Sequence, residues 1–190
     1  MKKFCVLIFT ILLTAGILAG CGAQSGEAAP SEAPTAPEAP SKSEGPSGDG
    51  GFYENGDLAS DFELPASSGG SIKLSELRGK PTVLNFWATW CGYCCEELPD
   101  FERIKEDYDG KANVLTVNVG ESPDTVSAFL SENEYTFLTA LDEEGKINYP
   151  TNIIPYTLVL DGDGRVVFSK LGGARDGMYD IIAAVLDDLM

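Results

Sequence analysis

Histidine is absent from the 190 residues of this chain. Its absence removes the commonest general base, the commonest metal ligand and the usual partner of a nucleophilic cysteine. Basic residues are also scarce, because 13 Lys and Arg stand against 30 Asp and Glu, and the formal net charge is −17. A surface this acidic repels nucleic acid and anionic lipid headgroups. The composition therefore argues against a DNA-binding or polybasic membrane role.

Cysteine is left as the residue type best able to carry chemistry, and the chain has five: Cys5, Cys21, Cys91, Cys94 and Cys95. Hydrophobic residues make up 43% of the chain, enough for the packed core of one domain of ordinary size. The cysteines fall into separate groups along the chain, so each group is interpreted by its own surroundings.

The N-terminus has the pattern of an export signal. Lys2 and Lys3 precede an apolar run over residues 4–18, which ends in small residues before Cys21. The run is somewhat short for a membrane span of about 20 residues. The order predicts a signal peptide over residues 1–20, and Cys5 leaves with it.

The residues at the end of the apolar run, Leu18-Ala19-Gly20-Cys21, resemble the bacterial lipobox. The resemblance implies that the Cys21 thiol receives a lipid and becomes the new N-terminus, with palmitate as a further acyl group. The alternatives are an ordinary cleavage site with a chance cysteine, or an uncleaved anchor helix. We expect lipid attachment at Cys21, on the extracytoplasmic side of the cell membrane.

Residues 21–56 are predicted to be the lipidated cysteine and a disordered tether. The stretch is rich in Ala, Pro, Glu, Ser and Gly, holds five of the eleven prolines and shows no apolar periodicity. Such a sequence cannot bury enough surface to offset the entropy of ordering. Residues 57–190 are then expected to form the folded domain.

The folded part is predicted to be an α/β domain with a mixed central sheet flanked by helices. Alternating and continuous apolar runs predict strands, and apolar spacings of three and four predict helices. The expected elements, in order, are a hairpin over 61–74, a helical turn over 75–79, a buried strand over 82–88, a helix over 92–108, a strand over 113–119, a helix over 123–133, an extended segment over 137–141, a strand pair over 156–161 and 165–169, and a helix over 178–189.

The motif that carries the chemistry is Trp90-Cys91-Gly92-Tyr93-Cys94, placed where the buried strand ends and the helix begins. Helix N-terminal amides stabilise a thiolate, which makes Cys91 a usable nucleophile. The spacing brings the second sulfur within bonding distance. We predict a redox pair in which Cys91 is the exposed attacking residue and Cys94 the more buried resolving residue.

Two other interpretations of this motif compete. A structural disulfide is one, although such a bond rarely spans two residues at the start of a helix. Half of a zinc site is the other, but zinc needs four ligands and only Cys95 remains, without any histidine. The sequence therefore predicts no metal and no cofactor besides the Cys91–Cys94 pair.

Residues 84–94 resemble the active-site strand and loop of the thioredoxin-like superfamily. Residues 75–81 and Glu97-Leu98-Pro99 are similar to the TlpA/ResA branch of membrane-tethered thiol–disulfide oxidoreductases. The resemblance covers about residues 58–189. It implies a thioredoxin-like fold with an N-terminal β-hairpin extension.

The resemblance also implies a substrate-binding surface. Ile154-Pro155 occupies the place of the cis-proline loop, which pairs with the backbone of the client. Trp90, Gly92 and Tyr93 would contact the client beside it. Tyr156 departs from the family pattern, which often has threonine or a small residue after this proline.

A third catalytic residue is implied at Glu97, one helical turn after Cys94. In the branch, a glutamate here assists proton transfer, whereas thioredoxin uses an aspartate at the position of Asn85. The alternative is a solvated helix charge, and the missing acid at residue 85 favours the catalytic role. Cys95 has two interpretations that the sequence leaves open: a small helix residue beside the site, or a spare resolving thiol.

The expected function is an enzyme that reduces disulfides of exported proteins such as apocytochrome c, with electrons from an integral membrane thiol donor. The acidic side chains of Glu96, Glu97 and Asp100 near the pair favour a reductant over an oxidant. We expect a lipid-anchored monomer without nucleic-acid partners. Two alternatives remain: a peroxiredoxin-like thiol peroxidase, and a non-catalytic binding lipoprotein.

Overall fold

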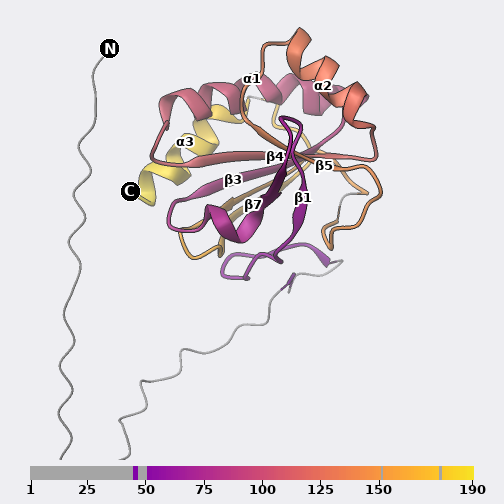
Figure 1. Ribbon diagram of the computed structural model, residues 1–190. Coiled ribbons are helices and arrows are strands. Elements are labelled where there is room, and N and C mark those ends of the chain that lie inside the picture. The colour runs from indigo at the N-terminus through magenta and orange to yellow at the C-terminus, as the bar shows by residue number, and fades with distance from the viewer. Residues whose placement is uncertain (1–44, 47–50, 151, 176) are drawn as a thin grey trace, which may run out of the picture. The chain divides into compact units, whose positions relative to one another are not determined.

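The computed structural model describes residues 45–46, 51–150, 152–175 and 177–190 (Figure 1). The chain divides into two units, Met1–Ala39 and Pro40–Met190, and every described residue belongs to the second. The predicted signal peptide, Cys21 and most of the predicted tether lie outside the described residues.

A five-stranded mixed sheet forms the centre of the domain (Figure 1). Its strands lie in the order β5-β4-β3-β6-β7, where β3, β4 and β5 are parallel, β6 is antiparallel to β3, and β7 is antiparallel to β6. Every residue of β3 is buried, which explains its nearly continuous apolar run. The strands are β3 (Thr82–Trp87), β4 (Asn113–Val119), β5 (Leu138–Asp142), β6 (Tyr156–Leu160) and β7 (Val166–Leu171).

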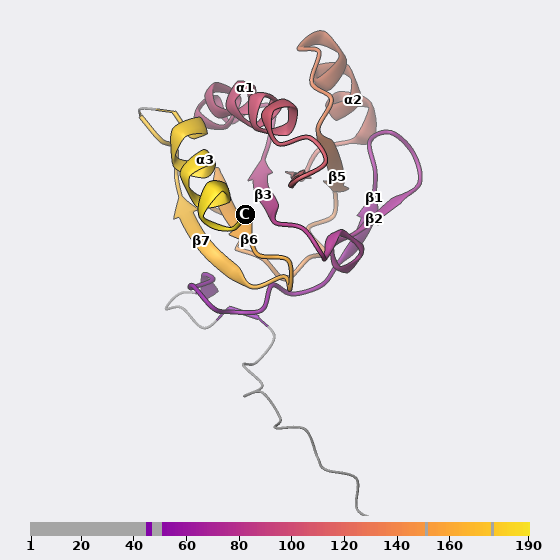
Figure 2. The ribbon, with the colours of Figure 1, turned by 90° about the vertical axis from the view of Figure 1, so that its left-hand side faces the viewer.

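Three helices pack on one face of the sheet (Figure 2): α1 (Gly92–Asp107), α2 (Pro123–Glu132) and α3 (Tyr179–Asp188). The inward side chains of α1 and α3 join those of β3 in a single buried cluster. The predicted start of α2 is confirmed, because Ser122 is its N-cap and accepts a hydrogen bond from the Thr125 backbone N–H.

The opposite face of the sheet is covered by the segment that precedes β3. It contains the expected antiparallel hairpin of β1 (Glu63–Pro65) and β2 (Ser71–Lys73), followed by the 3₁₀ turn η2 (Leu74–Leu77). The hairpin reaches the edge of the sheet, where Ala66 forms a bridge with Ala140 of β5. The buried side chains of this segment and of the sheet face above it form a second cluster.

The folded domain begins earlier than residue 57, the start expected from the sequence. Tyr53 is only 2% exposed. Its backbone N–H donates to the Tyr156 hydroxyl at 3.0 Å, and its ring stacks on Tyr149 with the centroids 5.0 Å apart. The predicted tether therefore cannot extend to residue 56, since its last residues contribute to the core.

The expected fold class is confirmed: a mixed central sheet with flanking helices and an N-terminal hairpin. The C-terminal ends of β3 and β4 lie at the same end of the sheet because these strands are parallel. The loop that leads into α1 and the loop that leads into α2 both start at this end.

Candidate redox site

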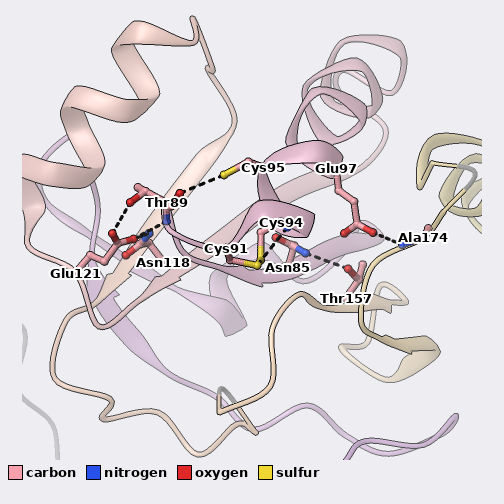
Figure 3. Close-up of a disulfide and its surroundings, with 10 residues drawn as sticks. All are labelled: Asn85, Thr89, Cys91, Cys94, Cys95, Glu97, Asn118, Glu121, Thr157 and Ala174. Carbon is pink, nitrogen blue, oxygen red and sulfur yellow. Dashed lines mark hydrogen bonds between the residues drawn. A yellow bond between two sulfur atoms is a disulfide. The ribbon is translucent and has the colours of Figure 1, made fainter.

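The two cysteines of the motif form a disulfide at the start of α1. After β3, a turn closed by a 3.1 Å hydrogen bond from the Cys91 N–H to the Ala88 carbonyl brings Cys91 to the N-cap position. The Cys91 sulfur accepts a hydrogen bond from the Cys94 backbone N–H at 3.2 Å. The Cα atoms of Cys91 and Cys94 are 5.2 Å apart, and the sulfurs are bonded (Figure 3). A thiolate at Cys91 would meet the positive end of the helix.

The two cysteine residues differ in access to solvent. In the disulfide form Cys91 is 8% exposed and Cys94 is 1% exposed. Cys91 is thus less exposed than the sequence analysis expected, although it is still the more accessible of the two. The order agrees with exchange at Cys91: in the disulfide form an external thiolate attacks this sulfur, and in the dithiol form this sulfur attacks an external disulfide.

Trp90 and Tyr93 lie directly before Cys91 and Cys94 in the chain, and we call these two residues the aromatic rim. The side chains of Trp90 and Tyr93 are 71% and 69% exposed, an unusual state for large aromatic rings. Gly173 lies directly against Tyr93, because a Cβ atom added there would come within 3.1 Å of the Tyr93 Cβ. The rings of Trp90 and Tyr93, both predicted to contact the substrate, are therefore largely open to solvent.

The predicted cis-proline loop lies beside this rim. The Ile154–Pro155 peptide bond is cis, as the resemblance implied. Pro155 is buried, and its carbonyl accepts a hydrogen bond from the Gly172 N–H at 2.8 Å. An open groove of about 380 Å³ is lined by Trp90, Val119, Gly120, Gly145, Asn152 and Ile154. The structure therefore brings Trp90 and Ile154 to one concave surface.

Glu97 is buried, with 3% of its surface exposed, so it is not a solvated helix charge. One carboxylate oxygen accepts a hydrogen bond from the Ala174 N–H at 2.6 Å, and the other has no partner among the described residues. Burial raises the pKa of Glu97 and outweighs the lowering by Ala174 and Lys170. The folded domain therefore favours the protonated form of Glu97 more than free solution does.

Asn85 lies in the core beneath the disulfide (Figure 3). Its amide group donates to the Thr157 hydroxyl at 3.0 Å, while its buried carbonyl oxygen has no partner among the described residues. Asn85 cannot titrate, and Glu97 lies on α1 three residues after Cys94. Figure 3 shows Glu97 reaching from α1 toward the segment that carries Ala174.

A second cluster, which the sequence analysis did not identify, lies on the other side of the pair. Glu121 accepts hydrogen bonds from the Thr89 N–H at 2.7 Å, from the Thr89 hydroxyl at 2.5 Å and from the Asn118 amide at 2.8 Å. The Thr89 carbonyl accepts from the Cys95 thiol at 3.3 Å. An acidic residue directly after the strand beside β3 is the signal that could have found it, because parallel strands end at one edge.

Among the described residues, no group of three or more His, Cys, Asp or Glu side chains could hold a metal ion. Within the same ranges, no helix has both the length and the apolar composition needed to cross a membrane.

A Cys-x-x-Cys disulfide at the start of the helix that follows the central strand of a mixed sheet defines a thioredoxin-like thiol–disulfide oxidoreductase. Enzymes of this class use their own cysteine pair and no cofactor. The sequence model of the AhpC/TSA family matches residues 55–169, and the chain belongs to this family.

Its relatives include the thioredoxin-like protein YneN of Bacillus subtilis, 37% identical over 118 residues that cover 60% of this chain and 69% of YneN. The thiol-disulfide oxidoreductase ResA of the same organism is 32% identical over 126 residues, which cover 65% of this chain and 70% of ResA. A solved structure, the exposed lipoprotein thioredoxin of Streptococcus pneumoniae, has a TM-score of 0.60 and 28% identity, and the match covers 68% of this chain and all of that one. The chain is thus of the TlpA/ResA type.

Proposed function

We propose that this protein reduces disulfides of exported proteins outside the cytoplasm, through a dithiol/disulfide cycle of Cys91 and Cys94. The observation that carries the proposal is the Cys91–Cys94 bond at the start of α1, with Cys91 the more exposed sulfur. The names of the relatives support thiol–disulfide exchange as the reaction.

The cycle starts from the reduced pair. The Cys91 thiolate attacks one sulfur of the client disulfide, so that a mixed disulfide forms and the first client sulfur leaves as a thiolate. Cys94 then loses its proton and attacks the Cys91 sulfur. The second client thiol leaves, the Cys91–Cys94 bond forms, and two electrons have passed to the client.

Glu97 is the proposed proton acceptor for Cys94. Cys94 is almost fully buried, so its proton cannot pass directly to bulk water. Glu97 begins the next turn of the same helix, and one of its buried oxygens is free to accept a proton. Its raised pKa brings the carboxyl group closer to the neutral range where a general base works best.

The exposed aromatic rim and the groove beside Ile154 are the proposed client-binding surface. Trp90 and Tyr93 would cover apolar parts of the client near its disulfide, with Gly92 between them. The backbone before Pro155 would pair with an extended client segment. Apocytochrome c is the proposed client, and an integral membrane thiol protein is the proposed donor that restores the dithiol.

The direction of electron flow follows from the charges near the pair. A strong oxidant needs a strongly stabilised thiolate. Glu96, Glu97 and Asp100 place acidic groups on the second and third turns of α1, which disfavours a thiolate. We therefore expect a reduction potential near the thioredoxin value of about −270 mV rather than the strong-oxidant value of about −120 mV.

The proposed location is the outer side of the cell membrane, with a lipid on Cys21 and the following residues as a spacer. The support is the sequence pattern at residues 1–21 and the similarity to an exposed lipoprotein thioredoxin.

Reduction of insulin disulfides by the reduced protein tests the proposed reaction. We expect Cys91→Ser to abolish turnover, because the attacking thiolate is lost, and Cys94→Ser to accumulate a mixed disulfide with the client. Alkylation of the reduced protein should modify Cys91 before Cys94. Preferential alkylation of Cys94 would reverse the assignment of roles.

Thiol peroxidase activity is the second candidate, favoured by the match to the AhpC/TSA family. The paired cysteines and the exposed Trp90 before Cys91 argue against it. Consumption of hydrogen peroxide by the reduced protein at a rate equal to or above its rate with insulin would establish the peroxidase instead.

A further inference from the structure

The mechanism proposed above uses two of three neighbouring cysteines. Cys95 follows Cys94 directly and is only partly buried. Its backbone N–H donates to the Cys91 carbonyl at 3.0 Å, so Cys91 and Cys95 lie one helical turn apart. In the reduced protein, Cys95 is therefore near enough to Cys91 to compete with Cys94 as the resolving thiol. The arrangement raises the question of what keeps Cys95 out of the exchange.

The Cys95 thiol is directed away from the pair. It donates a hydrogen bond to the Thr89 carbonyl at 3.3 Å, and Figure 3 shows its sulfur pointing toward Thr89 rather than toward the disulfide. Thr89 lies inside the turn that the Cys91 N–H closes on the Ala88 carbonyl. The acceptor of the Cys95 thiol is therefore part of the same turn that presents Cys91.

Glu121 holds this turn in place. Its carboxylate accepts from both the backbone N–H and the hydroxyl of Thr89, and a third bond from Asn118 fixes the carboxylate itself. Asn118 is a fully buried residue of β4, so the contact joins the turn to the rigid sheet. Hydrogen bonds to a charged acceptor are roughly twice as strong as those between neutral groups.

We infer that Glu121 is a positioning residue that selects the cysteine pair: by holding Thr89, it keeps the Cys95 thiol on the Thr89 carbonyl and leaves Cys94 as the resolving partner of Cys91. The inference rests on the proposed dithiol cycle and adds the reason why the third thiol takes no part in it. Oxidation of the reduced protein then removes two protons and two electrons from Cys91 and Cys94 alone.

The charge of Glu121, like its hydrogen bonds, keeps Cys95 out of the exchange. Burial raises the pKa of the Cys95 thiol, and the nearby Glu121 carboxylate raises it further. Tyr135, from the segment after α2, is a further titratable group that interacts with Cys95. A thiol that keeps its proton is a poor nucleophile, because the thiolate is the reactive form.

Disulfide mapping of the full chain tests the inference. The reduced protein is oxidised with one equivalent of oxidised glutathione, and its remaining thiols are blocked by one alkylating reagent. The disulfide is then reduced, and a second reagent labels the cysteines that were bonded. Fragmentation of the peptide that holds all three cysteines reports which pair had formed.

Among these three cysteines of the wild type, we expect the first reagent mainly on Cys95, with a small fraction of Cys95-containing disulfide as the baseline. Glu121→Gln keeps the shape of the side chain but removes its charge and one hydrogen-bond acceptor. We expect the fraction of Cys95-containing disulfide to rise about threefold or more, which is the effect of one lost hydrogen bond. Thr89→Val keeps the Glu121 charge and removes one bond, so it should change the pairing in the same direction and less strongly. Thr89→Val also supplies the test if Glu121→Gln does not fold.

Asp124→Asn is the matched control, because it removes an exposed acidic charge three residues away, in the first turn of α2. It should leave the pairing as in the wild type. Unchanged pairing in both Glu121→Gln and Thr89→Val would overturn the inference, and so would an equal change in Asp124→Asn. Failure of the wild type to reduce insulin would instead contradict the proposed function, because the mapping does not depend on a client.

Discussion

At the scale of single residues, the proposed role of Glu97 implies two opposing effects on the chemistry of the pair. Its charge disfavours a nearby thiolate, while its free oxygen can accept the Cys94 proton. Glu97→Gln keeps the shape and the hydrogen bond from Ala174 but removes both effects. We expect the thiol pKa values to fall and turnover at neutral pH to drop, by ~10²–10⁴-fold if no water replaces the base.

Thiol titration and insulin reduction by the wild type and Glu97→Gln measure the two effects separately. Glu106→Gln is the control, because Glu106 is an exposed acid of α1 that lies further along the helix from the pair. Unchanged pKa values together with unchanged turnover in Glu97→Gln would show that Glu97 has no part in proton transfer.

The burial of Glu97 also predicts how the free energy of unfolding depends on pH. Its pKa is raised above the ordinary value of 4.5, so the folded state favours the protonated form more than the unfolded chain does. The stability that this preference contributes is present below pH 4.5 and is lost as the pH rises through the folded-state pKa. We expect Glu97→Gln to gain stability relative to the wild type as the pH rises from about 4 to about 7. Urea unfolding of both proteins across this range measures the difference, and a constant difference would contradict the prediction.

The sequence could nominate Glu97 but not show its burial. The partner that covers it, Ala174, lies 77 residues further along the chain, and only the packing of the segment before α3 on α1 brings them together. Glu121 was missed for a similar reason, since its partner Thr89 is 32 residues away. The cysteine pair was predictable because its spacing and its place at a strand–helix junction are local features.

At the scale of elements, α1 supplies a cap that α3 lacks in its own sequence. Met178 precedes α3 and offers no side-chain cap. Asp100 of α1 instead accepts hydrogen bonds from the Met178 N–H at 2.6 Å and the Tyr179 N–H at 3.2 Å. The acidic group also lies at the positive end of α3. The start of the last helix therefore depends on a side chain of the first.

Removal of this cap should cost stability. Asp100→Ala leaves two helix N–H groups without their partner, and we expect a loss of about 0.5–2 kcal/mol in the free energy of unfolding. Glu106→Ala is the control, because Glu106 is exposed on the same helix. Urea unfolding of the two variants measures the effect, and an equal loss in both would show that Asp100 does not act as a cap.

Most element bounds could be predicted because their causes are local. The β4 strand has the expected bounds, Asn113–Val119, and α2 starts at Pro123 after its serine cap. The start of the domain could not be predicted in this way. Tyr53 follows a stretch rich in Pro, Gly and Ser, and the aromatic rings that bury it come from Tyr149 and other distant residues. A local pattern carries no sign of such partners.

At the scale of the whole molecule, the proposed function requires the domain to work outside the cytoplasm, near a membrane. The net charge of −17 gives the chain no electrostatic attraction to an anionic membrane surface. A covalent lipid is therefore the feature of the chain best suited to keep it there, and more than one acyl chain makes the attachment stable. The prediction depends on Cys21, which lies outside the described residues.

Cys21→Ala tests this attachment in the bacterium. The variant cannot accept a lipid, so we expect it to be released from the membrane fraction or to keep its signal peptide and run at a larger size. Cys5→Ala is the matched control, because it removes a cysteine from the predicted signal peptide without touching the lipobox. It should fractionate with membranes at the mature size.

Membrane fractionation and electrophoresis of both variants decide the matter, and a Cys21→Ala protein that stays wholly with membranes at the mature size would contradict lipid attachment. The insulin-reducing activity of the released domain should be unchanged, because the lipid positions the enzyme and takes no part in the exchange.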